Sequence, residues 1–116
     1  MYNRLGGAEG IAKIVDDTMT AHLKNPIIKT RFENIGDVER AKRMAREFFS
    51  AGAGGPEPYT GKDMMAAHKG MNISEQEYMA AMDDILEALT KNKVSEGAVK
   101  DVIAILYSLK GQIIRV

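Results

Sequence analysis

Apolar residues recur at three- and four-residue intervals in four stretches of the chain, which is the spacing of an amphipathic α-helix. The stretches run from Ala8 to about Leu23, onward from Asp37, from Glu75 to about Lys91, and onward from Ser95. No stretch alternates apolar and polar residues as a half-buried strand does, so the sequence predicts an all-α fold. The inward stripe of the first helix consists of Ile11, Ile14, Val15, Thr18, Met19, His22 and Leu23.

Local signals mark where these helices begin and end. Pro26 follows Asn25 and ends the first helix, because proline has no backbone N–H to continue it. Residues 27–32 are then expected to form a short turn. Asp37 and Ser95 are suited to cap helix N-termini, and residues 74–77 (SEQE) have the pattern of a capping box. Residues 52–61 contain four glycines and two prolines, which predicts a loop.

Composition narrows the class of protein without naming a function. A length of 116 residues suits one domain, expected to span residues 1–116. Sixteen basic and sixteen acidic side chains cancel, so the charge balance indicates neither a nucleic acid nor an anionic membrane as a partner. The chain has no cysteine, which excludes disulfides, thiolate metal sites and covalent heme attachment through cysteine. With no apolar run long enough to cross a bilayer, we expect a cytoplasmic protein.

Residues 61–71 (GKDMMAAHKGM) form a short segment with helical character that carries His68, one of only two histidines. A neutral imidazole is a common protein ligand for iron and other transition metals. A histidine among methionines and alanines is more often an ordinary core or surface residue, so composition leaves both interpretations open. The eight methionines are flexible enough to line an irregular pocket, although most are expected to pack in the core.

Several motifs together resemble the truncated hemoglobins of the first group. Residues 54–56 (GGP), 59–64 (YTGKDM) and 67–70 (AHKG) are similar to the region that leads into the proximal histidine of that family. Residues 2–7 (YNRLGG) and 11–17 (IAKIVDD) also look like that family, and so does Phe32. The resemblance covers nearly the whole chain. It implies a two-over-two helical sandwich, an abbreviated globin fold, that holds heme b noncovalently.

The resemblance also implies roles for individual residues. His68 corresponds to the proximal iron ligand, whose Nε2 would bind the metal while Nδ1 donates to a backbone carbonyl. Phe32 corresponds to the phenylalanine that packs on the heme face, and Lys62 to a basic residue that approaches the propionates. Arg40 and Arg43 would flank the cofactor edge, although a solvated face explains these charges equally well. The other expected heme contacts are Met44, Ala45, Phe48, Met64 and Tyr78.

On the distal side the sequence departs from the family pattern. The tyrosine that donates a hydrogen bond to bound dioxygen in many members corresponds to Met19, and the supporting glutamines correspond to Ala41 and Ala45. An apparent insertion near Gly36 makes the latter register uncertain by one residue, which leaves Arg40 and Met44 as candidates. Without a donor worth about 1.5–3 kcal/mol, dioxygen release is expected to be roughly one to two orders of magnitude faster.

Two side chains could instead occupy the sixth iron position. Met19 is a soft, long side chain, and a histidine–methionine pair is a ligand set of electron-transferring cytochromes. His22 lies one turn further along the same helix and could bind iron, donate to a ligand or bond a backbone carbonyl. Simple packing is the more common role for both. The last helix has no histidine, so the vinyl crosslink of some relatives cannot form.

The sequence is compatible with three heme-dependent functions and with one alternative that does not involve heme. The first is a hemoglobin that binds dioxygen, nitric oxide or carbon monoxide, with oxygen transport as one possible task. The second is a nitric oxide dioxygenase, which would need an external reductase because no flavin or nicotinamide motif is present. The third is a six-coordinate heme protein in electron transfer or redox sensing. The alternative without heme is a helical adaptor protein.

Overall fold

The computed structural model describes residues 2–33, 36–56, 58–61 and 63–115, and within these residues all regular structure is helical. The all-α prediction is therefore confirmed. Only one isolated β-bridge is present in the described part of the chain, between Ile73 and Ile114. The elements are η1 (Asn3–Leu5), α1 (Gly7–Lys24), α2 (Lys29–Glu33), α3 (Val38–Gly52), α4 (Met64–His68), α5 (Glu75–Lys91), α6 (Glu96–Ser108) and α7 (Lys110–Ile113).

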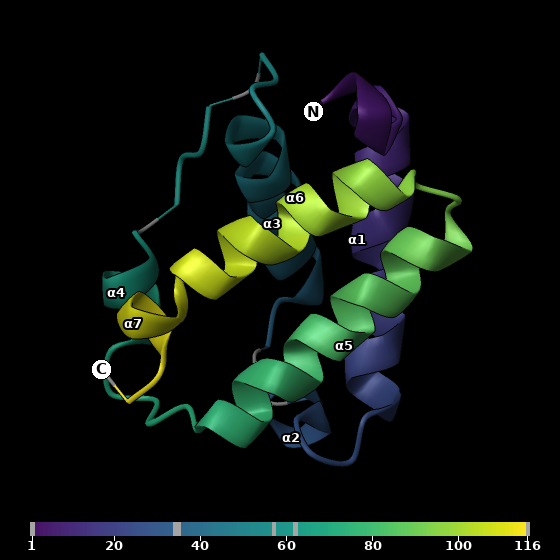
Figure 1. The fold of residues 1–116 in the computed structure, drawn as a ribbon. Coiled ribbons are helices and arrows are strands. Elements are labelled where there is room, and N and C mark those ends of the chain that lie inside the picture. Colours follow the sequence, from purple (N-terminus) through teal and green to yellow (C-terminus); the bar gives the residue numbers. More distant parts are fainter. Residues whose placement is uncertain (1, 34–35, 57, 62, 116) are drawn as a thin grey trace.

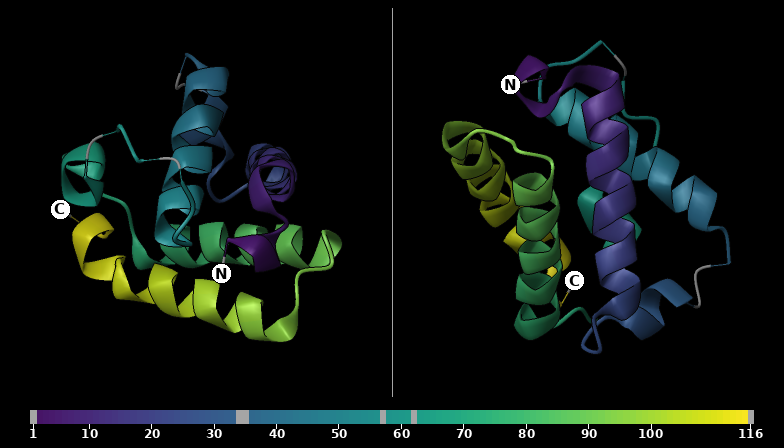
Figure 2. Two further views of the ribbon diagram at one scale, coloured as in Figure 1. Left: turned by 90° about the horizontal axis from the view of Figure 1, so that it is seen from above. Right: turned by 90° about the vertical axis from the view of Figure 1, so that its right-hand side faces the viewer.

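The four long helices are arranged as one pair packed on another. Helices α5 and α6 form one layer, while α1 and α3 form the other (Figures 1 and 2). Helix α1 contacts both α5 and α3, so it joins the two layers. The short helices α4 and α7 contact each other at one end of the molecule (Figure 1). This leaves α4 beside the helical sandwich rather than within it.

The predicted helix signals act as expected. The Asp37 side chain accepts a hydrogen bond from the Arg40 N–H at 2.9 Å and caps α3. Ser74 and Glu77 form the complete capping box at the start of α5, because each side chain accepts from the other residue's backbone N–H. Ser95 caps α6, and α1 ends immediately before Asn25 and Pro26. These predictions are confirmed.

Two local expectations were incomplete. Residues 27–32 were expected to be a turn, but the short helix α2 begins within them because Ile28 is buried and anchors the segment. The last helix was expected to be continuous, but it breaks between α6 and α7 at Leu109. At the break the Ser108 hydroxyl donates to the Ile105 carbonyl at 2.6 Å, and such side-chain bonds compete with the helical ladder. The break lets Ile113 turn inward.

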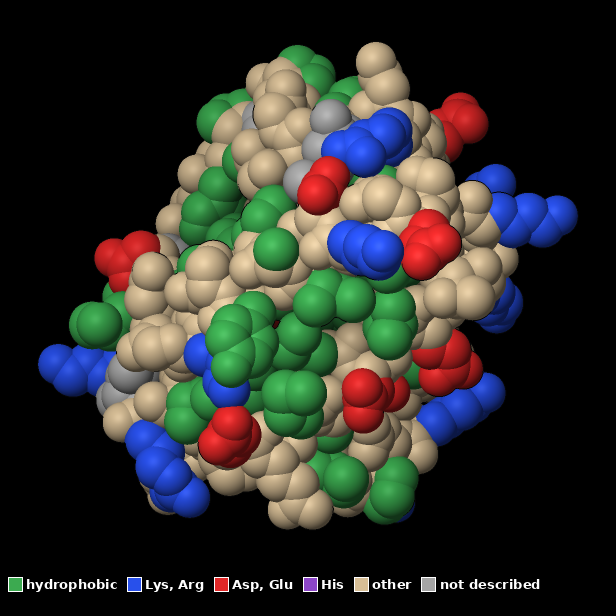
Figure 3. All heavy atoms as spheres, viewed as in Figure 1, with side chains coloured by type: hydrophobic (Ala, Val, Ile, Leu, Met, Phe, Trp, Pro, Cys, Tyr) green, Lys and Arg blue, Asp and Glu red, His purple; other side chains and the backbone are tan. Residues whose placement is uncertain are grey.

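The core consists of two clusters. The first cluster lies between the two layers and contains the two large side chains that are completely buried, Ile14 and Leu89. The second lies toward α4 and α7 and consists of Ile73, Tyr78, Met82 and Ile113. Hydrophobic side chains also gather on the surface between α5 and α6 (Figure 3).

The glycines near the N-terminus allow the chain to fold back on itself closely. Gly6 has a φ of +92°, a conformation that side chains disfavour, and a Cβ there would lie 2.9 Å from the Gly10 Cα. A Cβ on Gly10 would lie 2.2 Å from the Leu5 carbonyl oxygen. Both positions therefore require glycine for Leu5 to enter the core.

Candidate functional site

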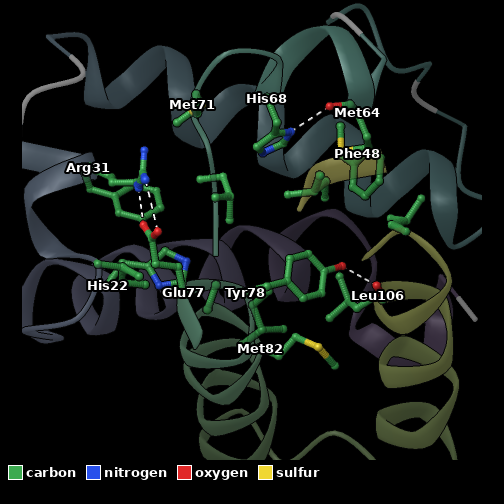
Figure 4. Close-up of a pocket in the computed structure, with 17 residues that line it drawn as sticks. His22, Arg31, Phe48, Met64, His68, Met71, Glu77, Tyr78, Met82 and Leu106 are labelled. Carbon is green, nitrogen blue, oxygen red and sulfur yellow. Dashed lines mark hydrogen bonds and ion pairs between the residues drawn. The ribbon is translucent and has the colours of Figure 1, made fainter. Parts of the chain in front are cut away.

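A pocket of about 290 Å³ opens beside the second core cluster, and every helix from α1 to α7 contributes to its wall (Figure 4). Nearly all of its wall is apolar, as is typical of a ligand site that holds a large hydrophobic group. The four members of the second cluster form part of this wall. The remaining wall residues are His22, Ile28, Arg31, Phe32, Phe48, Met64, His68, Met71, Glu77, Ala81, Ile85, Leu106 and Leu109.

His68 is the last residue of α4 and reaches the pocket with a defined ring orientation. The Asp63 side chain accepts from the Ala66 N–H at 2.8 Å and caps this five-residue helix. The His68 Nδ1 lies 2.8 Å from the carbonyl oxygen of Met64, one turn earlier (Figure 4). Because a carbonyl oxygen can only accept, Nδ1 carries a proton, and the neutral ring therefore has its lone pair on Nε2. This is the arrangement of a histidine prepared to bind a metal.

The loop that leads into α4 is fixed to α3. Glu47 accepts from both the backbone N–H and the hydroxyl of Thr60, at 2.9 and 2.6 Å. These hydrogen bonds lower the pKa of the Glu47 carboxyl. The Tyr59 ring packs edge-on against Phe48 at 5.5 Å between ring centroids. The glycine- and proline-rich loop is thus held against α3 before α4 begins.

A second histidine faces the pocket from α1. The His22 ring stacks on Phe32, with 4.5 Å between ring centroids and 21° between the planes. His22 and His68 lie on different walls of the same pocket (Figure 4). The two rings therefore border a common apolar space.

His22 is paired with a buried carboxylate. Its Nδ1 lies 2.7 Å from Oδ2 of Asp84 on α5, and each residue is only 7% exposed. The Asn25 Nδ2 also donates to both Asp84 oxygens, at 3.3 and 3.2 Å. Burial lowers the pKa of His22, and the hydrogen bond and charge of Asp84 offset this only in part. The folded protein therefore favours a neutral His22.

An ion pair borders the pocket on the side of α2. The Arg31 guanidinium binds the Glu77 carboxylate through two nitrogens, one of them at 3.1 Å (Figure 4). This pair lowers the pKa of Glu77, with burial acting in the opposite direction. Since Glu77 also completes the capping box, one carboxylate connects α2 to the start of α5.

Tyr78 connects the two helices of its layer at the pocket. Its hydroxyl donates to the Leu106 carbonyl oxygen of α6, and its ring lines the pocket (Figure 4). Burial raises the pKa of this phenol. The neutral hydroxyl therefore has a partner in the protein, while the ring remains available for apolar contact.

The structure brings together most of the residues that the sequence proposed for the site. The proposed residues in the pocket wall are His68, His22, Phe32, Phe48, Met64 and Tyr78. Met19 is buried in α1 but is not part of this wall. Met44 lies against Gly61, and Ala45 packs on the first core cluster.

The basic residues proposed for the cofactor edge lie elsewhere. Arg40 and Arg43 border a separate shallow depression on α3, together with Asp37, Glu39 and Arg46. The Arg43 Nε lies 3.7 Å from a Glu47 oxygen. Lys62 lies outside the described residues.

Several wall residues were not proposed from the sequence as part of a site. Met82 and Ile85 lie on a predicted amphipathic helix, but the period of a helix does not distinguish a pocket wall from a core. Arg31 and Glu77 gave no signal of pairing, because they are 46 residues apart. For Asp84 a signal did exist, since it lies between Ala80 and Ala88 at four-residue intervals on a buried stripe.

The family model described as bacterial-like globin matches residues 1–115. The chain belongs to this family. The group 1 truncated hemoglobin GlbN of Mycolicibacterium paratuberculosis is 28% identical over 97% of this chain and 82% of the relative. The group 1 truncated hemoglobin of Tetrahymena pyriformis is 26% identical over 91% of this chain and 87% of the relative. The proposed resemblance to group I truncated hemoglobins is confirmed.

Solved truncated hemoglobins share the fold. The ferric Tetrahymena pyriformis structure has a TM-score of 0.93 at 23% identity, over 99% of this chain and 97% of that chain. A Synechococcus 2/2 hemoglobin with covalently attached heme has a TM-score of 0.86 at 23% identity, over 96% of this chain and 93% of that chain. The two-over-two arrangement of this bacterial-like globin is thereby confirmed.

Membership in a globin family implies a heme-binding protein. Iron in the heme and small gaseous ligands are what such a family leads one to expect. Within the described residues, every helix is too short or too polar to span a bilayer.

Proposed function

We propose that this globin binds heme b noncovalently in the pocket beside α4, with Nε2 of His68 as the iron ligand. The hydrogen bond from His68 Nδ1 to the Met64 carbonyl carries this proposal, because in the neutral ring it places the lone pair on Nε2. When bound, the heme would supply an iron that can hold both a protein ligand and a small gas. The remaining position would bind dioxygen, nitric oxide or carbon monoxide.

The residues present suit a porphyrin. The wall is apolar on α6 and α7, and on α5 apart from Glu77, which matches the faces and vinyl edges of the macrocycle. Phe32 and Phe48 supply aromatic faces from α2 and α3, and Tyr78 supplies a third from α5. Because Tyr78 already donates to Leu106, it contributes contact area without an unpaired hydroxyl. The attachment would be noncovalent, since α6 and α7 contain no histidine.

The gas site would lack the donors common in the family. The resemblance sets Met19 where a donor tyrosine is expected, and Ala41 and Ala45 at the glutamine positions. None of these side chains can donate a hydrogen bond to bound dioxygen. Rapid dioxygen exchange suits transient gas binding better than tight storage. Turnover of nitric oxide to nitrate would additionally require an external reductase.

A six-coordinate heme protein is the second candidate, and the position of His22 favours it. His22 lines the same pocket as His68 and has no protein partner on Nε2 among the described residues. A bis-histidine iron would suit electron transfer or redox sensing. For Met19 the same argument is weaker, because Met19 does not line the pocket.

An absorption spectrum of the hemin-reconstituted protein tests both proposals. We expect a Soret band with one equivalent of hemin and a five-coordinate, high-spin ferrous spectrum that changes on addition of carbon monoxide. A six-coordinate, low-spin ferrous spectrum without added ligand would favour the second candidate. Absence of a Soret band would contradict both. His22→Gln serves as a matched variant, because only a His22 ligand makes it convert a low-spin spectrum to a high-spin one.

A further inference from the structure

A hydrogen-bond network of Asn25, Asp84 and His22 lies behind the pocket, and its contacts determine which atom of each pair is the donor. It begins at the backbone N–H of Ile27, which donates to Oδ1 of Asn25 at 3.1 Å. A backbone N–H can only donate, so this contact fixes which end of the Asn25 amide is oxygen. The Nδ2 end must then donate, and it points to Asp84.

The same logic continues from Asp84 to His22. Oδ2 of Asp84 lies 2.7 Å from Nδ1 of His22. An imidazole with a pKa near 6.5 is more basic than a carboxyl with a pKa near 3.9, so the shared proton stays on the ring. Nδ1 is therefore the donor. Burial of the ring lowers the pKa of His22 and disfavours a second proton.

We infer that Asp84 is a positioning residue that holds His22 as its Nδ1–H tautomer, so that Nε2 offers a lone pair rather than a proton to the pocket. The stack on Phe32 fixes the plane of the ring. The pocket wall thus carries a hydrogen-bond acceptor, and not a donor, on the side of α1. Such an acceptor favours small ligands that carry their own hydrogen, such as hydrogen sulfide, over dioxygen and carbon monoxide, which carry none.

This preference rests on the proposed heme function, whereas the tautomer does not. Long-range proton–nitrogen correlation spectra of the heme-free protein report which imidazole nitrogen is protonated. The chain has only two histidines, so His22→Gln assigns both sets of signals. We expect His22 to show a protonated Nδ1 and an unprotonated Nε2 at neutral pH. A protonated Nε2 would overturn the inference.

Asp84→Asn should replace the acceptor that faces Nδ1 of His22 by a donor, in a side chain of nearly the same shape. The Asn25 amide still requires an acceptor, so the new carbonyl oxygen is expected to face Asn25. The new NH₂ group then donates to Nδ1 of His22, and the proton moves to Nε2. Carboxylate-to-amide changes beside a histidine have this effect in serine proteases. Asp83→Asn is the matched control, because it removes the same charge from the adjacent, exposed residue.

The ligand experiment compares hydrogen sulfide binding to the ferric protein with dioxygen release from the ferrous protein. Relative to Asp83→Asn, we expect Asp84→Asn to bind hydrogen sulfide about two- to tenfold more weakly and to release dioxygen about two- to tenfold more slowly. Equal behaviour of the two variants would overturn the ligand preference. If Asp84→Asn does not fold, His22→Gln must weaken hydrogen sulfide binding, and unchanged affinity would again overturn it.

Failure of the heme proposal can be distinguished from failure of the tautomer inference, because the two are measured on different forms of the protein. Wild-type protein without a Soret band would remove the heme function and the ligand preference together. The spectra of the heme-free protein would still decide the tautomer of His22.

Discussion

The two histidines of this globin face one pocket, yet they are held in different ways. His68 ends a five-residue helix and bonds a carbonyl oxygen four residues earlier, so its orientation is set within one helical turn. His22 lies near the end of an 18-residue helix and bonds Asp84, which is 62 residues away. His68 is partly exposed, while His22 is buried with its charged partner.

The difference shows how one side-chain type can serve two purposes in a single site. A backbone carbonyl orients an imidazole without adding a full charge, which suits a ligand that must meet a cofactor from an accessible side. A buried carboxylate orients an imidazole and also ties α1 to α5, so its loss should affect folding as well as chemistry. The experiments below test this contrast.

The largest effect is expected at His68. Replacement by alanine removes the proposed iron ligand but leaves the apolar wall, so hemin affinity should fall by about 100-fold. Hemin titration followed at the Soret band measures this loss. The thermal unfolding midpoint of the heme-free protein should change little, because the histidine is partly exposed. The control variant His22→Gln should retain a Soret band. An equal loss of hemin affinity in both variants would show that His68 and His22 do not differ in their roles toward heme.

Removal of the Asp84 carboxylate should mainly destabilise the fold. Asp84→Ala leaves the buried Nδ1–H of His22 and the Asn25 amide without their acceptor, which should lower the free energy of unfolding by about 2–3 kcal/mol. Urea unfolding of the heme-free protein measures the change. Asp83→Ala is the control and should stay within about 0.5 kcal/mol of the wild type, because that residue is exposed.

The ion pair between α2 and α5 should give a pH-dependent effect. Arg31 lowers the pKa of Glu77 in the folded chain, so below an unfolded value near 4.5 the unfolded state binds more protons. The stabilisation is therefore fully present above about pH 4.5 and is lost as the pH falls through the folded value.

Glu77→Gln should therefore lower the free energy of unfolding by about 1 kcal/mol at pH 7. Its difference from the wild type should shrink as the pH falls below about 4.5. Glu87→Gln changes an exposed glutamate on the same helix and should show neither effect. A constant difference across this pH range would argue against the role of the carboxylate charge.

The smallest effect is expected at Met19. Met19→Leu keeps the volume of a buried side chain, so it should change stability by less than about 1.5 kcal/mol. Because Met19 does not line the pocket, the ferrous spectrum should remain unchanged. A change from low-spin to high-spin iron would show that the thioether is a ligand and would shift the distal role from His22 to Met19.

Much of the fold follows from short-range signals. Helix ends could be predicted where the signal acts within one helical turn. Examples are the caps Asp37, Ser74 and Ser95 and the helix stop at Pro26. The break at Leu109 could not be predicted, because the apolar stripe continues through it. Only the packing of Ile113 in the second cluster requires the chain to turn there.

The candidate site divides in the same way. His68 and the loop before it could be identified from the sequence, because the motif is contiguous and the bond to Met64 is local. The pairs Arg31–Glu77 and His22–Asp84 could not, since each joins helices that are distant in the chain.

The sequence alone therefore determined the four long helices, their capped starts, the family and the histidine beside the pocket, because each of these depends on contiguous motifs. Only the tertiary structure decided that His22 faces that pocket with Asp84 behind it. It also decided that Met19 does not line the pocket, because the rotation of α1 against α5 sets which side of the helix meets the cavity.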